Sequence, residues 1–224
     1  YTSNLIDKLK IKNIKKLVIP PTYSLNKSSK DKNTSLQKSK IVSLLTICRL
    51  EKRKGIIPVL RCLSNLNKKK LLKPFQWNIC GEGIQFEEIR ENIKKLNLSD
   101  QVFLIGKINT SLKQKLLESS DVFVMPSYKV NKSIEGFGIS YIEAAAYKIP
   151  SIAGIDGGVT DAVIDSKTGW CVDPLNQEKL TNVLKESINN KEKRQIYGMH
   201  AQNQFLQDFL GEKVFRKFMD TVSI

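Results

Sequence analysis

The feature that most constrains the fold is an alternation of short apolar runs with helical patterns, which continues from Ile41 almost to the end of the chain. The runs have the length of strands, and between them apolar residues recur three or four positions apart. Strands that are apolar on both faces are typical of a parallel sheet covered by helices on both sides. The sequence therefore predicts an α/β fold, a Rossmann-like doubly wound parallel sheet followed by C-terminal helices.

The pattern predicts six strands and eight helices. The strands are expected at Ile41–Cys48, Gln76–Gly81, Val102–Ile105, Val122–Met125, Ile149–Ala153 and Gly169–Val172. Helices are expected near Gly55–Leu66, Phe86–Leu96, Ser111–Ser119, Gly138–Tyr147, Val159–Ile164 and Gln177–Ile188. Two more, at about Lys191–Leu210 and Glu212–Val222, follow with no strand between them.

The first 40 residues have a different character. Tyr1–Lys16 has the apolar spacing of the end of an amphipathic helix, and Leu17–Ile19 is expected to form a short strand that Pro20 and Pro21 stop. Thr22–Lys40 is polar enough to be a linker or a mobile loop. The chain opens without Met, and we expect a fragment of a longer protein. The expected domains are a remnant of an N-terminal domain and linker at 1–40, a ligand-binding domain at 41–190, and C-terminal helices at 191–224.

The positive charge is concentrated at the amino-terminal end. Residues 1–73 contain 19 basic and 3 acidic residues, whereas residues 74–224 contain 18 and 19. A basic segment can bind nucleic acid, an anionic membrane surface or a phosphorylated ligand. Only six of the 37 basic residues are Arg, and no pattern of Arg and aromatic residues accompanies the lysines, so we expect no nucleic-acid partner. A bias toward the amino acids of AT-rich codons is an alternative source of the charge.

The cysteines and the single histidine give no sign of a metal site. Cys48, Cys62, Cys80 and Cys171 form no CxxC pair and have no neighbouring His, so they are expected to be buried thiols of a cytoplasmic protein. His200 lies in a predicted helix and is a weak candidate for acid–base chemistry. No apolar run approaches the ~20 residues that span a bilayer.

Two motifs follow the first two predicted strands, where ligands bind in such sheets. Arg49 and Lys54 leave the first strand and could converge on a diphosphate, although a solvated basic turn would have the same sequence. Gly81 and Gly83 permit a tight turn and a close approach of a ligand to the backbone. The position where a dinucleotide fingerprint has its third glycine is Phe86, which argues against a nicotinamide or flavin cofactor.

The most specific motif runs from Glu135 to Glu143, with Gly136 and Gly138 on either side of Phe137. The loop turns into a helix there, which leaves the first N–H groups of the helix available to a ligand oxygen. Ile139 and Glu143 share a helix face, and Glu135 precedes the first turn. Both carboxylates can border one pocket, where they suit the hydroxyls of a sugar or ribose better than a phosphate.

Residues Cys48 to Pro174 resemble the donor-binding half of the retaining glycosyltransferases of family 4, the group 1 enzymes with the two-domain GT-B fold. The resemblance rests on motifs in the order that the family has them. They are Arg49–Gly55, Gly81–Gly83, Phe103–Gly106, Ser120–Ser127, the carboxylates Glu135 and Glu143 with seven residues between them, and Gly157–Pro174.

The resemblance implies a function and a set of roles. It implies transfer of a sugar from a nucleotide-diphosphate donor to a hydroxyl acceptor with retention, without a metal or other cofactor. Arg49 and Lys54 would hold the diphosphate and Glu135 would face the donor sugar. The resemblance further implies donor contacts at seven positions. Gly81 and Gly83 would lie near the nucleotide, Ile108 beside the base, the N–H groups of Phe137, Gly138 and Ile139 against the sugar and distal phosphate, and Glu143 at the ribose hydroxyls.

The sequence departs from the family pattern in three ways, and two alternative functions are kept beside the leading one. Cys48 replaces a glycine and Asp161 stands where Glu is commoner. We also expect the N-terminal domain, which would bind a glycan or lipid-linked acceptor, to be missing apart from its last helix in Tyr1–Lys16. The fragment by itself is therefore expected to bind donor with little turnover. The alternatives are a non-catalytic nucleotide-sugar sensor or scaffold and a nucleic-acid or membrane-surface module. A cytoplasmic enzyme in peripheral contact with the inner face of the membrane is compatible with the leading interpretation.

Overall fold

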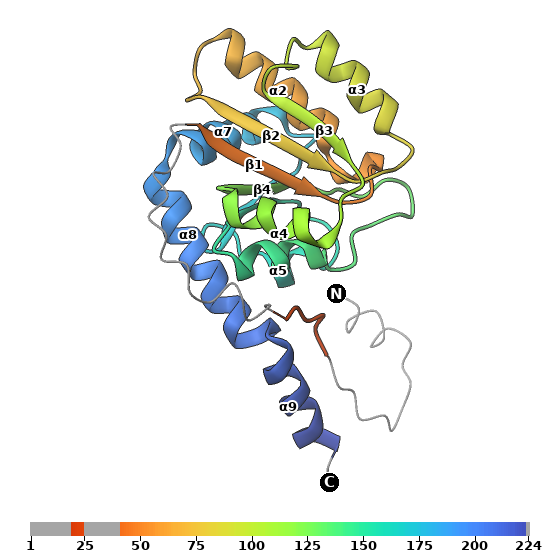
Figure 1. Ribbon diagram of the computed structural model, residues 1–224, viewed down its shortest axis with the longest axis vertical. Coiled ribbons are helices and arrows are strands. Elements are labelled where there is room, and N and C mark those ends of the chain that lie inside the picture. Colours follow the sequence, from red (N-terminus) through yellow and green to blue (C-terminus); the bar gives the residue numbers. More distant parts are fainter. Residues whose placement is uncertain (1–18, 25–40, 223–224) are drawn as a thin grey trace.

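The structure, a computed structural model, describes residues 19–24 and 41–222 and contains one six-stranded sheet (Figure 1). Its strands are β1 (Val42–Ile47), β2 (Phe75–Cys80), β3 (Val102–Gly106), β4 (Val122–Met125), β5 (Ser151–Ala153) and β6 (Gly169–Cys171). The strand order is β3-β2-β1-β4-β5-β6, and every neighbouring pair is parallel. The predicted Rossmann-like doubly wound sheet is confirmed.

The apolar strands build two cores, one on each face of the sheet. Successive side chains of a strand point to opposite faces, so Leu44 and Leu45 of β1 belong to different clusters although both are fully buried. Val124 and Phe123 of β4 divide in the same way. Because both faces need apolar cover, these strands show no alternation with polar residues, which is the pattern that predicted a parallel sheet.

The helices cover the two faces in two groups. The first core receives side chains from α2 (Ile56–Lys68), α3 (Phe86–Lys95) and α7 (Gln177–Asn189). The second receives them from α4 (Thr110–Ser119), α5 (Ile139–Ala146) and α6 (Val159–Ala162). A short 3-10 turn, η2 (Lys52–Lys54), links β1 to α2. Helix α8 (Lys191–Gln204) contributes Tyr197 to the first core and Ala201 to the second.

The end of the chain differs from the predicted helix Lys191–Leu210. Helix α8 ends at Gln204 and continues as a π-helical turn, η3 (Phe205–Phe209), before α9 (Gly211–Val222). Phe205 and Phe209 are both buried in the second core, as expected for residues four positions apart on one helix face. The sequence pattern predicts a regular helix here and does not indicate the wider turn.

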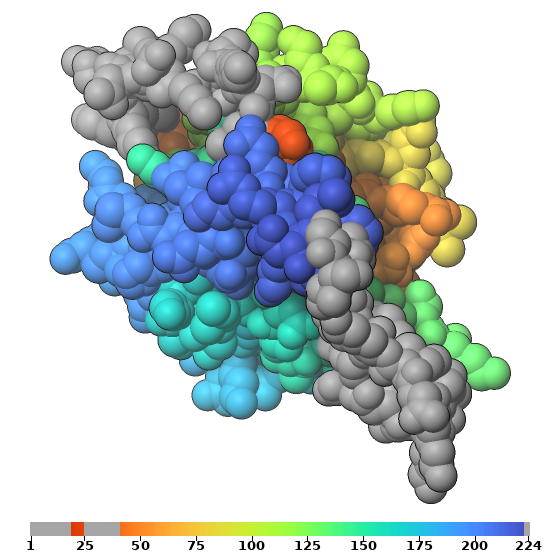
Figure 2. Space-filling view, turned by 90° about the horizontal axis from the view of Figure 1, so that it is seen from below, coloured from red at the N-terminus to blue at the C-terminus, as the bar shows by residue number. Residues whose placement is uncertain are grey.

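The described part of the amino-terminal region packs against this end of the chain. The N–H of Tyr23 donates to the carbonyl of Phe209 at 3.3 Å, and the Tyr23 and Phe205 rings lie 6.4 Å apart, as the contact between residues 19–24 and the C-terminal helices in Figure 2 indicates. Of the strand predicted at Leu17–Ile19, only Ile19 is described, and it lies in no strand. The predicted helix Tyr1–Lys16 and most of the predicted linker lie outside the described residues.

Helix α9 extends beyond the sheet and its covering helices (Figure 1). Phe215 is 64% exposed and Met219 41% exposed, so α9 presents an apolar face. The domain boundaries given above stay predictions.

Candidate functional site

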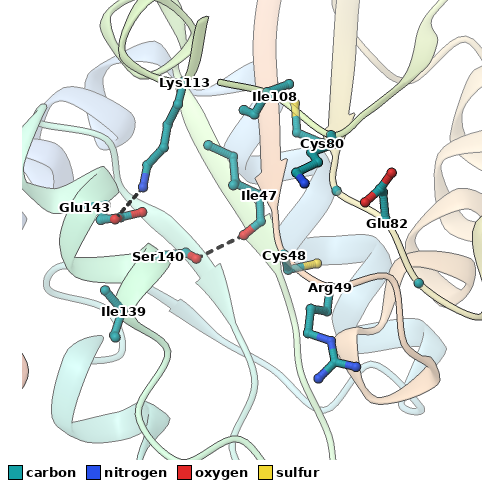
Figure 3. A pocket seen from close by; sticks show the side chains of 13 residues that line it. Ile47, Cys48, Arg49, Cys80, Glu82, Ile108, Lys113, Ile139, Ser140 and Glu143 are labelled. Atoms are coloured by element: carbon teal, nitrogen blue, oxygen red, sulfur yellow. Dashed lines mark hydrogen bonds and ion pairs between the residues drawn. The ribbon is translucent and has the colours of Figure 1, made fainter. Parts of the chain in front are cut away.

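A cavity of about 650 Å³ opens at the carboxyl edge of the sheet, where the ends of β1, β2 and β3 meet the start of α5 (Figure 3). The strand order reverses beside this cavity. After β1 the chain continues to β2 on one side of β1, whereas β4 lies on the other side of β1. Open α/β sheets bind ligands at such a switch point. The cavity is lined by Ile47, Cys48, Arg49, Cys80, Gly81, Glu82, Gly83, Lys107, Ile108, Lys113, Ile139, Ser140 and Glu143.

Glycine is required at the end of β2 because two strand ends meet there. Gly81 has φ +133°, and a Cβ at this position would lie 1.8 Å from the carbonyl oxygen of Cys48. Cys48 itself is half-buried, and burial raises the pKa of its thiol to about 12. At Cys48 and Gly81 this side of the cavity offers backbone and a neutral thiol, which allow a ligand to approach closely, and the neighbouring Glu82 adds an exposed carboxylate (Figure 3).

The opposite side is the start of α5. Gly138 precedes the helix with φ +83°, and a Cβ there would clash with the ring of Tyr141 at 2.5 Å. The hydroxyl of Ser140 donates to the carbonyl of Ile47 at 2.9 Å, which ties the first turn of α5 to the end of β1. The amino end of a helix carries a partial positive charge, so this side favours an anionic or hydroxyl-bearing ligand.

Glu143 projects into the cavity from α5 and forms an ion pair with Lys113 of α4 at 2.5 Å (Figure 3). The Glu143 side chain is 11% exposed and the Lys113 side chain 28% exposed. Glu143, which is predicted to accept hydrogen bonds from a hydroxyl-bearing ligand, therefore faces the cavity beside the Lys113 ammonium.

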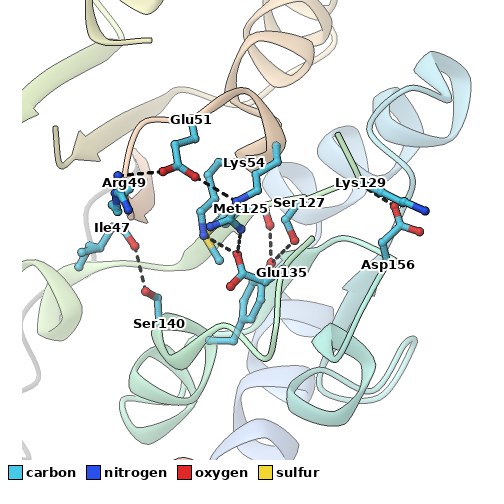
Figure 4. Close-up of polar contacts among 12 residues, drawn as sticks. Ile47, Arg49, Glu51, Lys54, Met125, Ser127, Lys129, Glu135, Ser140 and Asp156 are labelled. Carbon is cyan, nitrogen blue, oxygen red and sulfur yellow. Dashed lines mark hydrogen bonds and ion pairs between the residues drawn. The ribbon is translucent and has the colours of Figure 1, made fainter. Parts of the chain in front are cut away.

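A chain of ion pairs continues from the cavity toward β4 (Figure 4). Arg49 pairs with Glu51 at 3.2 Å, and Glu51 also accepts from Arg53 at 3.0 Å. Arg53 then donates to Glu135 at 2.7 Å, and Glu135 accepts from the buried ammonium of Lys54 as well. Three cations face two carboxylates in this chain, so it retains one positive charge for an anion.

Glu135 is held ionised by its two partners. Burial alone raises the pKa of a carboxyl group, but the hydrogen bonds and charges of Lys54 and Arg53 outweigh it and lower the pKa of Glu135 below its ordinary value. Glu135 therefore carries its negative charge throughout the neutral range, which makes it an acceptor for hydroxyl groups and not a proton donor.

Six of the ten predicted site residues line the cavity, which are Arg49, Gly81, Gly83, Ile108, Ile139 and Glu143. The other four do not line it. Lys54 and Glu135 belong to the ion-pair chain that begins at Arg49, whereas Phe137 packs its ring against Phe209 with 5.5 Å between centroids, and Gly138 caps α5. The roles assigned to these ten residues stay predictions.

Two cations of the site were not predicted. Arg53 lies in the basic run that directed attention to Arg49 and Lys54, and that run is the only signal that could have indicated it. Lys113 is one of 31 lysines, and nothing in the sequence distinguishes it. Only the packing of α4 beside α5 brings it to Glu143.

His200 lies outside this cavity. Its Nδ1 is 3.2 Å from the carbonyl oxygen of Lys167, and the ring lines a separate cavity of about 220 Å³ beside η3. Within residues 19–24 and 41–222, no group of three His, Cys, Asp or Glu side chains could hold a metal ion. No helix of that part of the chain is long and apolar enough to cross a membrane.

The parallel sheet and the cavity at its switch point, bordered by cations and by Glu143, define an α/β domain with a polar cavity at the carboxyl edge of its sheet. A sequence profile described as "Glycosyl transferases group 1" matches residues 27–204, and the chain belongs to this family. The family resemblance predicted from the motifs is confirmed at this level.

Curated relatives are glycosyltransferases of several specificities. The chain is 27% identical over 148 residues to 2-deoxystreptamine N-acetyl-D-glucosaminyltransferase of Niallia circulans, covering 66% of this chain and 37% of the relative. It is 26% identical over 168 residues to GDP-mannose-dependent alpha-(1-6)-phosphatidylinositol monomannoside mannosyltransferase of Mycolicibacterium smegmatis, covering 74% and 44%. The chain thus spans less than half the length of these two relatives.

Solved structures share the fold. A variant of S. aureus TarM in complex with fondaparinux, alpha-GlcNAc-glycerol and UDP superposes with a TM-score of 0.78 at 24% identity, over 97% of this chain and 41% of TarM. Anabaena Alr3699/HepE in complex with UDP and glucose superposes with a TM-score of 0.70 at 21% identity, over 84% and 50%. These similarities match the described sheet and its C-terminal helices to GT-B glycosyltransferases.

Proposed function

We propose that this chain is the donor-binding part of a retaining glycosyltransferase of family 4, which moves a sugar from a nucleotide-diphosphate donor to a hydroxyl acceptor. The observation that carries the proposal is the cavity, which combines a carboxylate, an arginine and the amino end of α5 at the switch point of a parallel sheet. The names of the relatives support it, since one uses GDP-mannose and two neighbours hold UDP.

The proposed donor would extend from the cavity to the ion-pair chain. Its nucleoside would lie in the cavity, with the ribose hydroxyls at Glu143, the base beside Ile108 and the turn at Gly81 and Gly83 against it. The diphosphate would lie against Arg49, whose side chain is 83% exposed and can form charge-assisted hydrogen bonds with phosphate oxygens.

The sugar would then lie along the ion-pair chain, where Lys54 meets the distal phosphate and Glu135 accepts from sugar hydroxyls. Negative charge builds on the leaving phosphate as the glycosidic bond breaks, and fixed cations and N–H groups stabilise it. The N–H groups of Phe137, Gly138 and Ile139 would contact the sugar and this phosphate. No step requires a metal or another cofactor.

The same proposal includes the kind of acceptor and the cellular location of the enzyme. A glycan or lipid-linked hydroxyl acceptor would be bound by an N-terminal domain braced by the C-terminal helices, and the enzyme would work in the cytoplasm, in peripheral contact with the inner face of the membrane. In this view the described chain binds donor and by itself turns over little or none of it.

Calorimetric titration of the chain with UDP, GDP and ADP tests the proposal. One of the three should bind saturably, and Arg49→Ala should weaken it about tenfold or more, as expected for lost charge-assisted hydrogen bonds. Lys52→Ala removes an exposed cation of the neighbouring turn and serves as the matched control. If no nucleotide binds, or if Arg49→Ala binds as the control does, the donor-site assignment is wrong. Binding without any transfer by a protein that contains the acceptor domain would favour the scaffold alternative.

A further inference from the structure

Lys113 occupies a defined position in the cavity and is not merely a flexible surface lysine. It projects from the first turns of α4, where the side chain of Asn109 accepts from the N–H of Leu112 and fixes the start of the helix. Its ammonium pairs with Glu143 and lies 6.0 Å from the centroid of the Tyr23 ring. Cation–π attraction and the ion pair together hold the ammonium at the cavity wall.

The two partners offer opposite hydrogen-bonding capacities at one point. The carboxylate of Glu143 is acceptor-only, and the ammonium of Lys113 has three donors and no acceptor. A hydroxyl group both donates and accepts, so two neighbouring hydroxyls can donate to the carboxylate and accept from the ammonium at the same time. A ligand that lacks one of these hydroxyls keeps the ion pair but loses a charge-assisted hydrogen bond to it, and the displaced water has no equivalent replacement.

We propose that Lys113, together with Glu143, recognises the ribose hydroxyls of the donor, and that Lys113 is thereby a determinant of ribose over 2′-deoxyribose. The inference rests on the proposed function, because it needs a nucleoside diphosphate in this cavity. It assigns a role to Lys113, which the sequence motifs do not include. In this inference Lys113 and Glu143 act together on the ribose hydroxyls.

A purely structural role makes a different prediction. The ion pair joins α4 to α5, and a brace between two helices would affect the stability of the fold and the affinity for every ligand alike. Selectivity between two ligands that differ by one hydroxyl is unaffected by such a brace. The ratio of the two dissociation constants is therefore the informative quantity.

The experiment is a set of titrations of the chain with the nucleoside diphosphate that binds best among UDP, GDP and ADP, and with its 2′-deoxy form. The variants are Lys113→Met, which keeps the length of the side chain without its charge, and Lys113→Arg, which keeps the donors. Lys115→Met removes an exposed charge of the same helix and is the matched control. Thermal unfolding of each variant reports whether the fold is retained.

We expect the wild-type chain and Lys115→Met to bind the ribonucleotide about tenfold more tightly than its 2′-deoxy form. Lys113→Met should reduce that preference to about twofold, and Lys113→Arg should restore most of it. An unchanged ratio in a folded Lys113→Met variant, or a wild-type chain that binds both forms equally, overturns the inference while the proposed function stands. A wild-type chain that binds none of the three nucleotides overturns both.

Discussion

Lys54 and Glu135 are 81 positions apart in the sequence, yet their side chains form an ion pair beneath the turn that connects β1 to α2. Only 8% of the Lys54 side chain and 12% of the Glu135 side chain is exposed. The pair joins the loop after β1 to the loop before α5, the two segments that carry the most specific motifs. It therefore fixes the geometry of the site as well as its charge.

We expect Lys54→Met to destabilise the fold by about 2 to 3 kcal/mol, because it leaves a buried carboxylate with one cationic partner fewer. Arg53 remains bonded to Glu135 and keeps the loss from being larger. Lys52→Met, an exposed change in the same turn, should alter the free energy of unfolding by less than about 0.5 kcal/mol. Urea unfolding measures both, and equal midpoints for the two variants would contradict a buried pair.

The pH dependence of stability should report Glu135. Its pKa is lowered in the folded chain, so the unfolded chain binds the proton at a higher pH, and stability is present at neutral pH and declines as the pH falls below about 5. Glu135→Gln should make the decline between about pH 5 and 3 shallower than in the wild type. Glu186, whose pKa is also lowered, keeps part of the decline in the variant.

Chemical unfolding at a series of pH values provides this measurement. Glu91→Gln, at an exposed carboxyl on α3, is the control and should follow the wild-type curve. Parallel curves for the wild type and Glu135→Gln would show that Lys54 and Arg53 do not hold that carboxyl ionised.

Gly81→Ala should destabilise the chain by about 2 to 3 kcal/mol, because Ala rarely adopts φ +133° and its Cβ would meet the carbonyl oxygen of Cys48. Gly136→Ala is the matched control, since a Cβ at Gly136 has no heavy atom within 4 Å. Thermal unfolding of the two variants distinguishes them. A Gly81→Ala variant as stable as Gly136→Ala would mean that the ends of β1 and β2 are farther apart than described.

The four thiols should react slowly in the folded chain. Burial raises the pKa of Cys48 and Cys171 to about 12 and of Cys80 to about 11, and it raises the pKa of Cys62 as well. The thiolate is the reactive form, so at pH 8 an aromatic disulfide reagent should label these thiols about 100-fold more slowly than in the urea-unfolded chain. One thiol that reacts in the native chain at the unfolded rate would contradict the burial described for it.

The fold could be predicted because the apolar runs that form its strands are short, local features of the sequence. Continuous apolar runs predicted the strands to within about two residues, and Val122–Met125 matches β4 at both ends. The prediction of a regular helix failed at the π-helical turn Phe205–Phe209. The four-residue spacing of the two aromatic residues suits one face of a regular helix, so the apolar pattern gives no signal for the wider turn.

The site was predictable where backbone geometry determines the residue type. Gly81 and Gly138 are needed for conformations that other residues avoid, and such positions can be recognised in the sequence. The partners of charged side chains could not be predicted, because they depend on which loops the sheet brings together. Lys113 opposite Glu143 and Arg53 opposite Glu135 are cases of this kind.

The cavity lining comes from five segments, which are the ends of β1, β2 and β3 and the first turns of α4 and α5. Of the lining residues, only Cys80 is a buried member of a core. Substitutions of the exposed side chains in one segment can therefore alter what the cavity accepts while the other segments and the sheet remain as they are. A library that varies one segment at a time, and keeps Cys80 and the glycines, would explore new ligand preferences at little cost to folding.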